Sequence, residues 1–347
     1  MSVLWGMTCA QLEAWALARG AGAGAARTLG RFWVARAAGR DQPAPARALL
    51  AAAEREFPPG PPPEADAVRD PDGTVRFAVR LHDGNLIETV LIQQAESATR
   101  AQARSTVCVS SQVGCARGCT FCETGRLGLV RNLSAAEIVA QYALSVREAA
   151  LLEAPPPRNL VFMGMGEPLD NLDEVLQAIA VLREPVGFAV PERRITVSTV
   201  GIVPRLDELY ARGGGTNLAV SLHALNEETR RSLLPVARRW PLSELRAAIA
   251  RSPRVVLLQW TLIEGVNDRD ADADALVEFA RGLDVRVNLI PLNPGPRDDQ
   301  HAPPPERARA FQKRLQDQGL RALLRLPHGQ SIGGACGQLA GARRLPG

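Results

Sequence analysis

Three cysteines lie within eight residues of one another, in the stretch Cys115-Ala-Arg-Gly-Cys119-Thr-Phe-Cys122. Thiolates bind soft metal ions, and a structural zinc site usually takes four ligands in two close pairs. Here there are three cysteines in one loop and no fourth nearby, so the spacing favours a [4Fe–4S] cluster in which each thiolate binds one iron. The fourth iron is then open to a substrate or cofactor, which predicts a cluster that takes part in chemistry. A structural zinc knuckle and a chance spacing are the alternatives.

The spacing Cys-x3-Cys-x2-Cys after a short predicted strand resembles that of the radical S-adenosylmethionine (SAM) superfamily. The resemblance implies that Cys115, Cys119 and Cys122 are the metal ligands. It also implies that the amino and carboxylate groups of SAM chelate the open iron.

Small or polar residues follow several predicted strands, at the ends where a parallel barrel places its site. Glycines in Met163-Gly-Met-Gly-Glu-Pro168 let the backbone approach a ligand closely, and Glu167 can accept hydrogen bonds from an ammonium group. Each of these residues could instead have a structural role. A lone His near a strand end, for example, is more often structural than catalytic. Their shared position at one rim predicts a SAM site. The predicted cofactor-binding residues are Gly166, Glu167, Ser198, Ser221, Leu222, His223 and Asn293.

The elements that position these residues alternate between strand and helix from Ser105 onward. This alternation predicts a parallel sheet with right-handed crossovers. Six units are too few for a closed eight-stranded barrel, so the predicted fold is α/β, with a partial (β/α)6 TIM-like barrel of radical SAM type. The predicted strands are 106–111, 160–163, 195–198, 218–222, 255–262 and 285–290. Helices are predicted at 134–153, from Asn171, and at 203–212, 226–234, 243–251, 270–281 and 304–318, with a last strand at 320–326.

Two predicted helix starts carry capping residues, Ser134 with Glu137 and Asn171 with Glu174. Four segments are expected in all. Residues 1–57 form a small helical accessory domain, which either touches RNA or is a packing appendage, and 58–73 form a Pro-rich linker. Residues 74–104 form a β-hairpin extension with its turn at Asp83-Gly84. Residues 105–347 form the core, with a C-terminal tail that bears Cys336.

Composition excludes some classes of protein. The chain of 347 residues is 46% hydrophobic and has no apolar run of eighteen residues, so no membrane span is expected. Clustered thiols that must stay reduced predict a cytoplasmic location. The net charge of +4 is too small to prove nucleic-acid binding, although almost all the basic residues are Arg, which suits phosphate. A biased genome composition is the alternative, and the many Ala and Pro residues favour it as the explanation of the Arg count.

Longer blocks of the sequence resemble the RlmN/Cfr family of radical SAM RNA methyltransferases. Members methylate a ring carbon of adenosine in 23S rRNA, C2 in one branch and C8 in the other, and some also act on tRNA. The resemblance implies the same activity here, with C2 favoured over C8. It covers roughly residues 75–341, and its blocks are 108–115, 131–137, 163–168, 221–224, 290–294 and 335–341.

The resemblance also gives roles to three residues outside the cluster. Cys336 would take a methyl group from one SAM, and a 5′-deoxyadenosyl radical from a second SAM would remove hydrogen from that methyl. The methylene would bond to the adenine carbon, Glu88 would take the proton from that carbon, and Cys108 would attack the Cys336 sulfur to release the base. The implied cofactors are a [4Fe–4S] cluster and two SAM per turnover. Cys336 as an inert thiol, Cys108 as a buried strand residue and Glu88 as a solvated hairpin residue are the alternatives.

The expected partners are RNA and an electron donor such as flavodoxin or ferredoxin, with the protein itself a monomer. The chain departs from the family at 326–332, where an acidic residue is usual near Ile332, and in a longer loop at 93–104. These departures bear on the RNA target more than on the reaction. Two other functions stay open: a radical SAM enzyme with a non-RNA substrate, and a non-catalytic metal-binding RNA protein.

Overall fold

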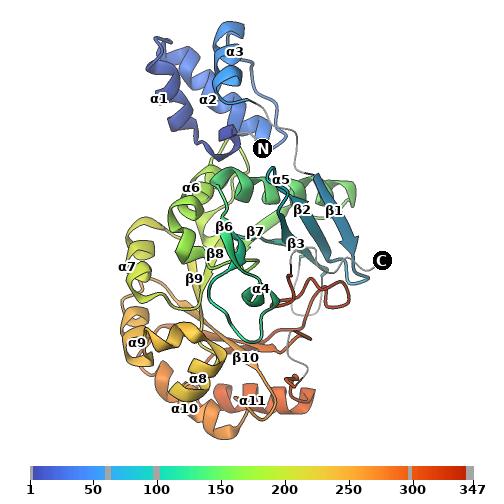
Figure 1. Cartoon of the computed structure of the whole chain (residues 1–347), viewed down its shortest axis with the longest axis vertical. Coiled ribbons are helices and arrows are strands. Elements are labelled where there is room, and N and C mark those ends of the chain that lie inside the picture. Colours follow the sequence, from blue (N-terminus) through green and yellow to red (C-terminus); the bar gives the residue numbers. More distant parts are fainter. Residues whose placement is uncertain (1–2, 59–63, 97–101, 296–298, 341–347) are drawn as a thin grey trace.

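The computed structural model describes residues 3–58, 64–96, 102–295 and 299–340. Residues 59–63 of the predicted linker, 97–101 of the predicted loop and the tail beyond 340 lie outside these ranges. Figure 1 shows the N-terminal helices, within residues 9–56, at one end of the molecule and a curved sheet, with helices around it, making up the rest.

Six parallel strands form the centre of the sheet and are neighbours in the order in which they occur along the chain. All six predicted strands are present, and the predicted last strand pairs parallel with the sixth. Aliphatic residues account for them, as in Asn217–Ser221, where Leu218, Ala219 and Val220 are buried. The predicted partial barrel is confirmed. Its strands are β4 (Arg104–Cys108), β7 (Pro157–Phe162), β8 (Ile195–Thr199), β9 (Asn217–Ser221), β10 (Val256–Leu262), β11 (Val285–Pro291) and β12 (Ala322–Leu324).

An antiparallel extension continues the sheet past β4. The predicted hairpin is present as β2 (Val75–Arg80) and β3 (Leu86–Gln94), and β3 pairs with β4. A further strand, β1 (Glu64–Arg69), pairs with β2 inside the stretch expected to be a linker. Expecting no strand there was wrong: β1 alternates only over Glu64-Ala-Asp-Ala67, is built largely from Ala, Asp and Glu, which are depleted in strands, and stays largely exposed.

Helices follow the parallel strands and lie around the outside of the sheet (Figure 1). Each turns an apolar face inward, as in Leu172–Arg183, where Leu172, Val175 and Ile179 are buried. Within the described part of the chain, no helix is both long and apolar enough to cross a bilayer. The helices are α5 (Ala135–Leu151), α6 (Leu172–Arg183), α7 (Val203–Arg212), α8 (Glu227–Leu233), α9 (Leu242–Ala250), α10 (Asp270–Ala280) and α11 (Pro305–Asp317), with short 3-10 turns η2 (Pro168–Asn171), η3 (Glu192–Arg194) and η4 (Pro235–Arg238).

One of the two predicted helix caps is present. Glu137 N–H donates to Ser134 Oγ at 3.3 Å, and Ser134 N–H donates to the Glu137 carboxylate at 2.9 Å. The predicted side-chain cap at Asn171 is absent. Its amide instead donates to the carbonyl oxygens of Ser111 and Leu133, both at 2.8 Å, so long-range acceptors take the place of the local one.

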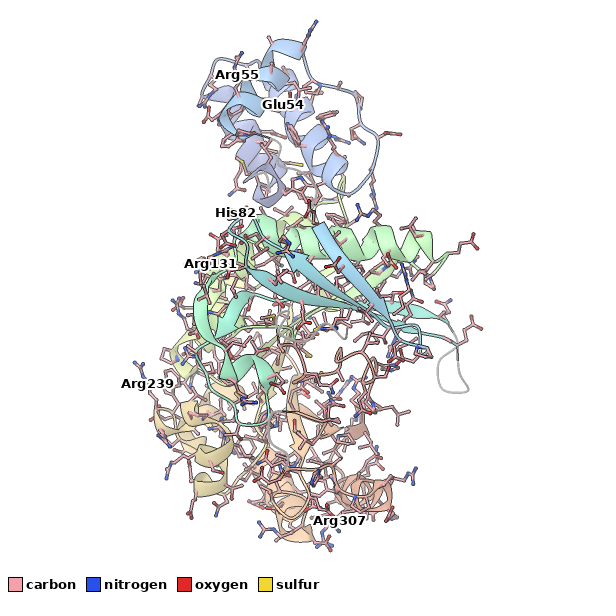
Figure 2. All side chains as sticks on the ribbon, turned by 45° about the vertical axis from the view of Figure 1, so that its right-hand side comes forward. Glu54, Arg55, His82, Arg131, Arg239 and Arg307 are labelled. Atoms are coloured by element: carbon pink, nitrogen blue, oxygen red, sulfur yellow. The ribbon has the colours of Figure 1, made fainter. Side chains whose placement is uncertain are left out.

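The N-terminal helices pack around an apolar cluster of their own. They are α1 (Cys9–Leu17), α2 (Ala23–Ala37) and α3 (Arg47–Glu56), after the short turn η1 (Val3–Gly6). Leu12, Leu29 and Trp33 are buried in this cluster, while Glu54 and Arg55 of α3 lie at the far end of the molecule (Figure 2).

Candidate active site

A small hairpin carries the cysteine loop at the carboxyl ends of the parallel strands. Its strands β5 (Gln112–Cys115) and β6 (Gly128–Asn132) pair antiparallel, and the short helix α4 (Glu123–Arg126) lies between them. Gly114 has a φ of +74°, and a Cβ there would lie 1.9 Å from the carbonyl oxygen of Gly128, so only glycine permits this pairing. The sequence gives no strong sign of this hairpin, because its strands are short and glycine-containing.

Arg131 fastens the hairpin to the rest of the fold. From β6 it donates to Asp83 at 2.6 Å and to Glu137 of α5 at 2.8 Å. Figure 2 shows Arg131 close to His82, the neighbour of Asp83 in the β2–β3 turn. The hairpin is thereby tied to the β2–β3 turn and to the start of α5.

Cys115, Cys119 and Cys122 all line one cavity. Burial raises the pKa of the Cys115 thiol to about 12, although the Arg117 N–H, 3.5 Å from the sulfur, opposes the rise. Burial also raises the pKa of Cys119, and negative charge on Cys122 and Cys115 adds to that rise. Thiols in such surroundings ionise readily only beside a positive metal, so this loop fits a metal cluster.

The arrangement differs from that of a single-ion site. Among the described residues, no group of three His, Cys, Asp or Glu side chains could hold one metal ion. In a [4Fe–4S] cluster each thiolate binds a different iron, so three sulfurs spread around a cavity suit a cluster.

Glu167 lies in the wall of the same cavity. Its carboxylate accepts the N–H groups of Leu169 at 3.0 Å and Val200 at 2.9 Å. Burial raises the pKa of Glu167 to about 7, and these two donors oppose the rise. A ligand ammonium group would supply the positive charge that this buried carboxyl lacks.

Three further predicted residues, Gly166, Ser198 and Ser221, line the cavity. Gly166 has a φ of +100°, and a Cβ there would lie 2.6 Å from the Gln112 Cβ, so the backbone must stay bare at this point. Leu222 does not line the cavity. Its side chain is buried in the core and its N–H donates to a carbonyl of β10.

His223 lines the cavity as a neutral donor. Its Nδ1 accepts the Thr261 N–H at 2.9 Å, which leaves the ring proton on Nε2. Burial lowers the pKa of His223 to about 3, and the charge of Arg230 adds to this effect. Phe121 packs edge-on against the ring, with the two ring centroids 4.8 Å apart.

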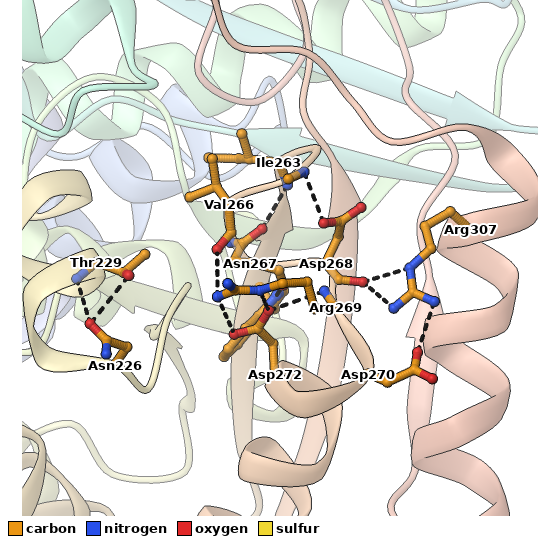
Figure 3. A network of polar contacts seen from close by, with 12 residues as sticks. Asn226, Thr229, Ile263, Val266, Asn267, Asp268, Arg269, Asp270, Asp272 and Arg307 are labelled. Atoms are coloured by element: carbon orange, nitrogen blue, oxygen red, sulfur yellow. Dashed lines mark hydrogen bonds and ion pairs between the residues drawn. The ribbon is translucent and has the colours of Figure 1, made fainter.

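Asn267 supports His223, whose backbone φ is +59°. The Asn267 amide is fully buried, and its Nδ2 donates to the carbonyl oxygens of His223 and Thr261, both at 2.7 Å. Its Oδ1 accepts the Ile263 N–H at 2.7 Å. Figure 3 shows this amide in a polar network that continues through Asp268 to α11. One buried side chain therefore sets the ends of both β9 and β10.

Cys336 lines the same cavity as the cluster cysteines, and its side chain is exposed. Asn293, which also lines the cavity, donates from Nδ2 to the Cys336 carbonyl oxygen at 3.0 Å. Glu123 N–H donates to the Gly337 carbonyl oxygen at 2.7 Å. The tail is thus fastened to the loop after β11 and to α4.

Cys108 ends β4 and is buried behind the cavity wall. Burial raises the pKa of its thiol, and negative charge on Cys336 adds to the rise. The two thiols therefore lie within electrostatic reach of each other, and both are free.

Glu88 lies on β3, is 1% exposed and does not line the cavity. Its carboxylate forms an ion pair with Arg76 of β2 and accepts the Ala340 N–H at 2.7 Å. The solvated alternative for Glu88 is therefore wrong, and the structure places this carboxylate against the Cys336 tail.

The β1–β2 turn holds the tail on the other side of Cys336. Asp72 accepts the Gly329 N–H at 3.0 Å and contacts His328 Nδ1 at 3.2 Å. Ser331 donates its hydroxyl to Asp70. These tail residues belong to the segment 326–332, in which the sequence departs from the family. The side chains that differ from the family there therefore bind acidic residues of the β1–β2 turn.

Several cavity-lining residues escaped prediction, notably Arg117, Phe121, Gln259 and Thr261. Gln259 and Thr261 interrupt the otherwise apolar strand β10 near its carboxyl end, and this interruption was a usable signal. Arg117 and Phe121 lie between the cysteines, and no sequence pattern of their own marks them as cavity residues.

Comparisons with known proteins agree with this geometry. The model of the radical SAM superfamily matches residues 109–277. A probable RNA methyltransferase from Sorangium cellulosum is 48% identical over 277 residues, which are 79% of this chain and 68% of that protein. A dual-specificity RNA methyltransferase RlmN from Syntrophobacter fumaroxidans is 47% identical over 272 residues, 77% of each chain.

A solved structure is similar over almost the whole length. The crystal structure of a radical SAM methyltransferase from Sphaerobacter thermophilus is 40% identical, with a TM-score of 0.86, and the match covers 97% of this chain and 99% of that one. The chain therefore belongs to the radical SAM superfamily and, within it, to the RlmN family of RNA methyltransferases.

Proposed function

We propose that this protein methylates a ring carbon of adenosine in RNA, C2 in preference to C8, through a methyl group carried on Cys336. The observation that carries the proposal is that Cys336 shares one cavity with the three cluster cysteines. Family membership makes the protein a radical SAM enzyme, which sets aside the zinc knuckle and the non-catalytic metal-binding protein. The expected RNA is 23S rRNA, with tRNA as a second substrate.

Cys115, Cys119 and Cys122 would hold the [4Fe–4S] cluster, and Glu167 would accept hydrogen bonds from the SAM ammonium group. When bound, the cluster and SAM supply a carbon-centred radical that removes hydrogen from a methyl group. Ser198, Ser221, His223 and Asn293 would position the rest of SAM, His223 through its Nε2 proton. Leu222 would contribute only through its backbone, because its side chain is buried away from the cavity.

Cys336 would carry the methyl group as a thioether, and its methylene would bond to the adenine carbon. The adduct must then lose the proton on that carbon and one electron; Glu88 is the proposed base, and the electron would pass to the cluster, which SAM cleavage has left oxidised. Taking the proton would neutralise the Glu88 carboxylate, which pairs with Arg76 and holds the Ala340 N–H. Cys108 would then attack the Cys336 sulfur, and the S–S bond would form as the bond from sulfur to the methylene breaks. The released electron pair takes up a proton and completes the methyl group.

The electron that starts SAM cleavage would come from flavodoxin or ferredoxin, the proposed donor, and a thiol reductant must afterwards supply two electrons to restore both thiols. A disulfide that forms and is reduced in every cycle suits the cytoplasm, where thiols are kept reduced. The proposed working form is a monomer.

Cysteine substitutions test the covalent route. Cys336→Ala should abolish RNA methylation while the absorbance of the cluster survives. Cys108→Ala should accumulate protein joined to RNA, seen on a denaturing gel as a band that nuclease removes. Cys9→Ala is the matched control: Cys9 lies in α1, away from the cavity, and its loss should leave methylation unchanged. Full methylation by Cys336→Ala would rule out the route, and mass spectrometry of rRNA and tRNA from cells with and without the protein identifies the base.

A further inference from the structure

Four exposed arginines lie at the amino ends of the parallel strands, the edge of the sheet opposite the cavity. Arg158 is the second residue of β7, and Arg193 lies in η3 just before β8. Arg286 is the second residue of β11, and Arg321 directly precedes β12. All four side chains are exposed, and together they are called the basal arginine surface below.

These residues come together as two pairs. Leu160 pairs with Ile195; Arg158 precedes this pair on β7 and Arg193 precedes it in η3. The next residue in each segment is joined to the other, because Arg194 donates to Asn159 Oδ1 at 3.1 Å. Val287 pairs with Ala322, and the Val287 N–H donates to the Arg321 carbonyl oxygen at 2.8 Å. Arg286 and Arg321 are thus neighbours on adjacent strands. Arg286 and Arg321 border one surface hollow at this end of the sheet, and Arg193 borders another.

These guanidinium groups are available to a ligand. Within the described residues, none of the four has an acidic or hydrogen-bonding side-chain partner, unlike Arg183, Arg251, Arg281 and Arg314. The nearest acids are largely engaged: Glu192 pairs with Arg183, and Glu278 pairs with Arg281 at 2.8 Å. Among the described residues, two exposed acids near these arginines have no such partner: Asp284, beside the β11 pair, and Glu153, five residues before Arg158.

The spacing favours a polymer over a single anion. Strands β9 and β10 separate the two pairs, so three strand spacings, roughly 14 Å, lie between β8 and β11. One phosphate cannot bridge that gap, whereas a nucleic-acid backbone with many phosphates can. The arginine fork also matches phosphate geometry.

Resting on the proposed function, we propose that the basal arginine surface binds the phosphate backbone of the RNA substrate, remote from its target base. The parallel strands are up to seven residues long, so this surface lies roughly 20 Å from the cavity. A short loop held in the cavity does not reach it. A large folded RNA can reach the basal arginine surface, and its phosphates at that surface would increase the affinity.

Direct binding measurements test this proposal without any need for methylation. Arg286→Gln with Arg321→Gln forms one double variant, and Arg158→Gln with Arg193→Gln forms the other. Each is titrated with a 23S rRNA transcript and with a short oligoadenylate at several salt concentrations. With the transcript, the slope of log K against log salt should become shallower by nearly 2 in each double variant, about 0.9 per lost phosphate contact. With oligoadenylate, the slope should not change.

Arg309→Gln is the matched control, an exposed arginine of α11 that likewise has no side-chain partner in the described part of the chain. Its salt slope should equal that of the wild type. An unchanged slope in both double variants would show that the basal arginine surface is only solvated. An equal fall with transcript and oligoadenylate would show a general effect of charge, and either result overturns the proposal. A wild type that binds the transcript but methylates no RNA would count against the proposed function alone.

Discussion

Glu167 combines deep burial with two backbone donors and no cationic side chain bonded to it in the described structure. The donors stabilise its charge, yet burial still raises its pKa to about 7. A carboxyl in this state takes up a proton easily near neutral pH and gives it up when a cation arrives. The residue is therefore suited to recognise an ammonium group, and it should release a proton when SAM binds.

This pKa predicts how stability without cofactors depends on pH. Between pH 4.5, the ordinary pKa, and about 7, the folded protein retains a proton that the unfolded chain has lost. Its stability should therefore fall as pH rises through this window, by up to about 3 kcal/mol from this group. Urea unfolding at pH 5 and pH 7.5 measures the fall, and Glu167→Gln should show a smaller one. Equal falls in the two proteins would contradict the assignment.

At the scale of elements, the ends of β9 and β10 are joined by the side chain of Asn267. An amide suits the position, because one group donates to two carbonyl oxygens and accepts an N–H. A carboxylate of the same shape would face those two oxygens without a hydrogen to offer, and an unmet buried group costs about 1–3 kcal/mol. The orientation of His223 in the cavity thus depends on a residue that does not line it.

Asn267→Asp should weaken SAM binding about tenfold or more while the iron content of the protein stays unchanged. Calorimetry with SAM under anaerobic conditions measures the affinity. Asn226→Asp is the control, because Asn226 caps α8 and Asp caps equally well. The unfolding temperature separates a local effect from general loss of structure: a variant that melts earlier but binds SAM normally would remove Asn267 from the positioning of His223.

At the scale of the whole molecule, the antiparallel extension holds the tail that carries Cys336. Asp72 binds the tail before Cys336, and Glu88 binds it afterwards. The extension and the tail lie far apart in sequence and meet only because β3 pairs with β4. The position of the reactive sulfur is therefore a property of the assembled sheet.

Asp72→Ala should loosen the segment before Cys336, because Gly329 and His328 lose their acceptor. Methylation should slow several-fold while the affinity for SAM is kept, and hydrogen exchange at Gly329 should speed up. Asp72→Asn retains one acceptor oxygen and should recover much of the rate. Equal losses in the Ala and Asn variants would show that charge, and not fastening of the tail, is what matters.

Sequence alone predicted those features that local pattern controls. Strands of consecutive buried aliphatic residues and the Ser134 cap follow from such patterns. The spacing of Cys115, Cys119 and Cys122 likewise indicates a [4Fe–4S] cluster. What it could not predict depends on tertiary partners. The side chain of Asn171 caps no helix because distant carbonyl groups accept hydrogen bonds from its amide. The sequence of β1 alone does not indicate a strand, which forms through its pairing with β2.

Among the residues that the structure describes, the sheet ends at β1 on one side and at β12 on the other. Unpaired strand edges invite other chains to add to them, which leads to aggregation. Here the first edge carries Glu64, Asp66 and Arg69, and the second is only three residues long. A foreign strand would have to desolvate charges at one border and would find few groups to pair with at the other. Sheet edges of this kind disfavour association of two copies through their strands, which supports the proposed monomer.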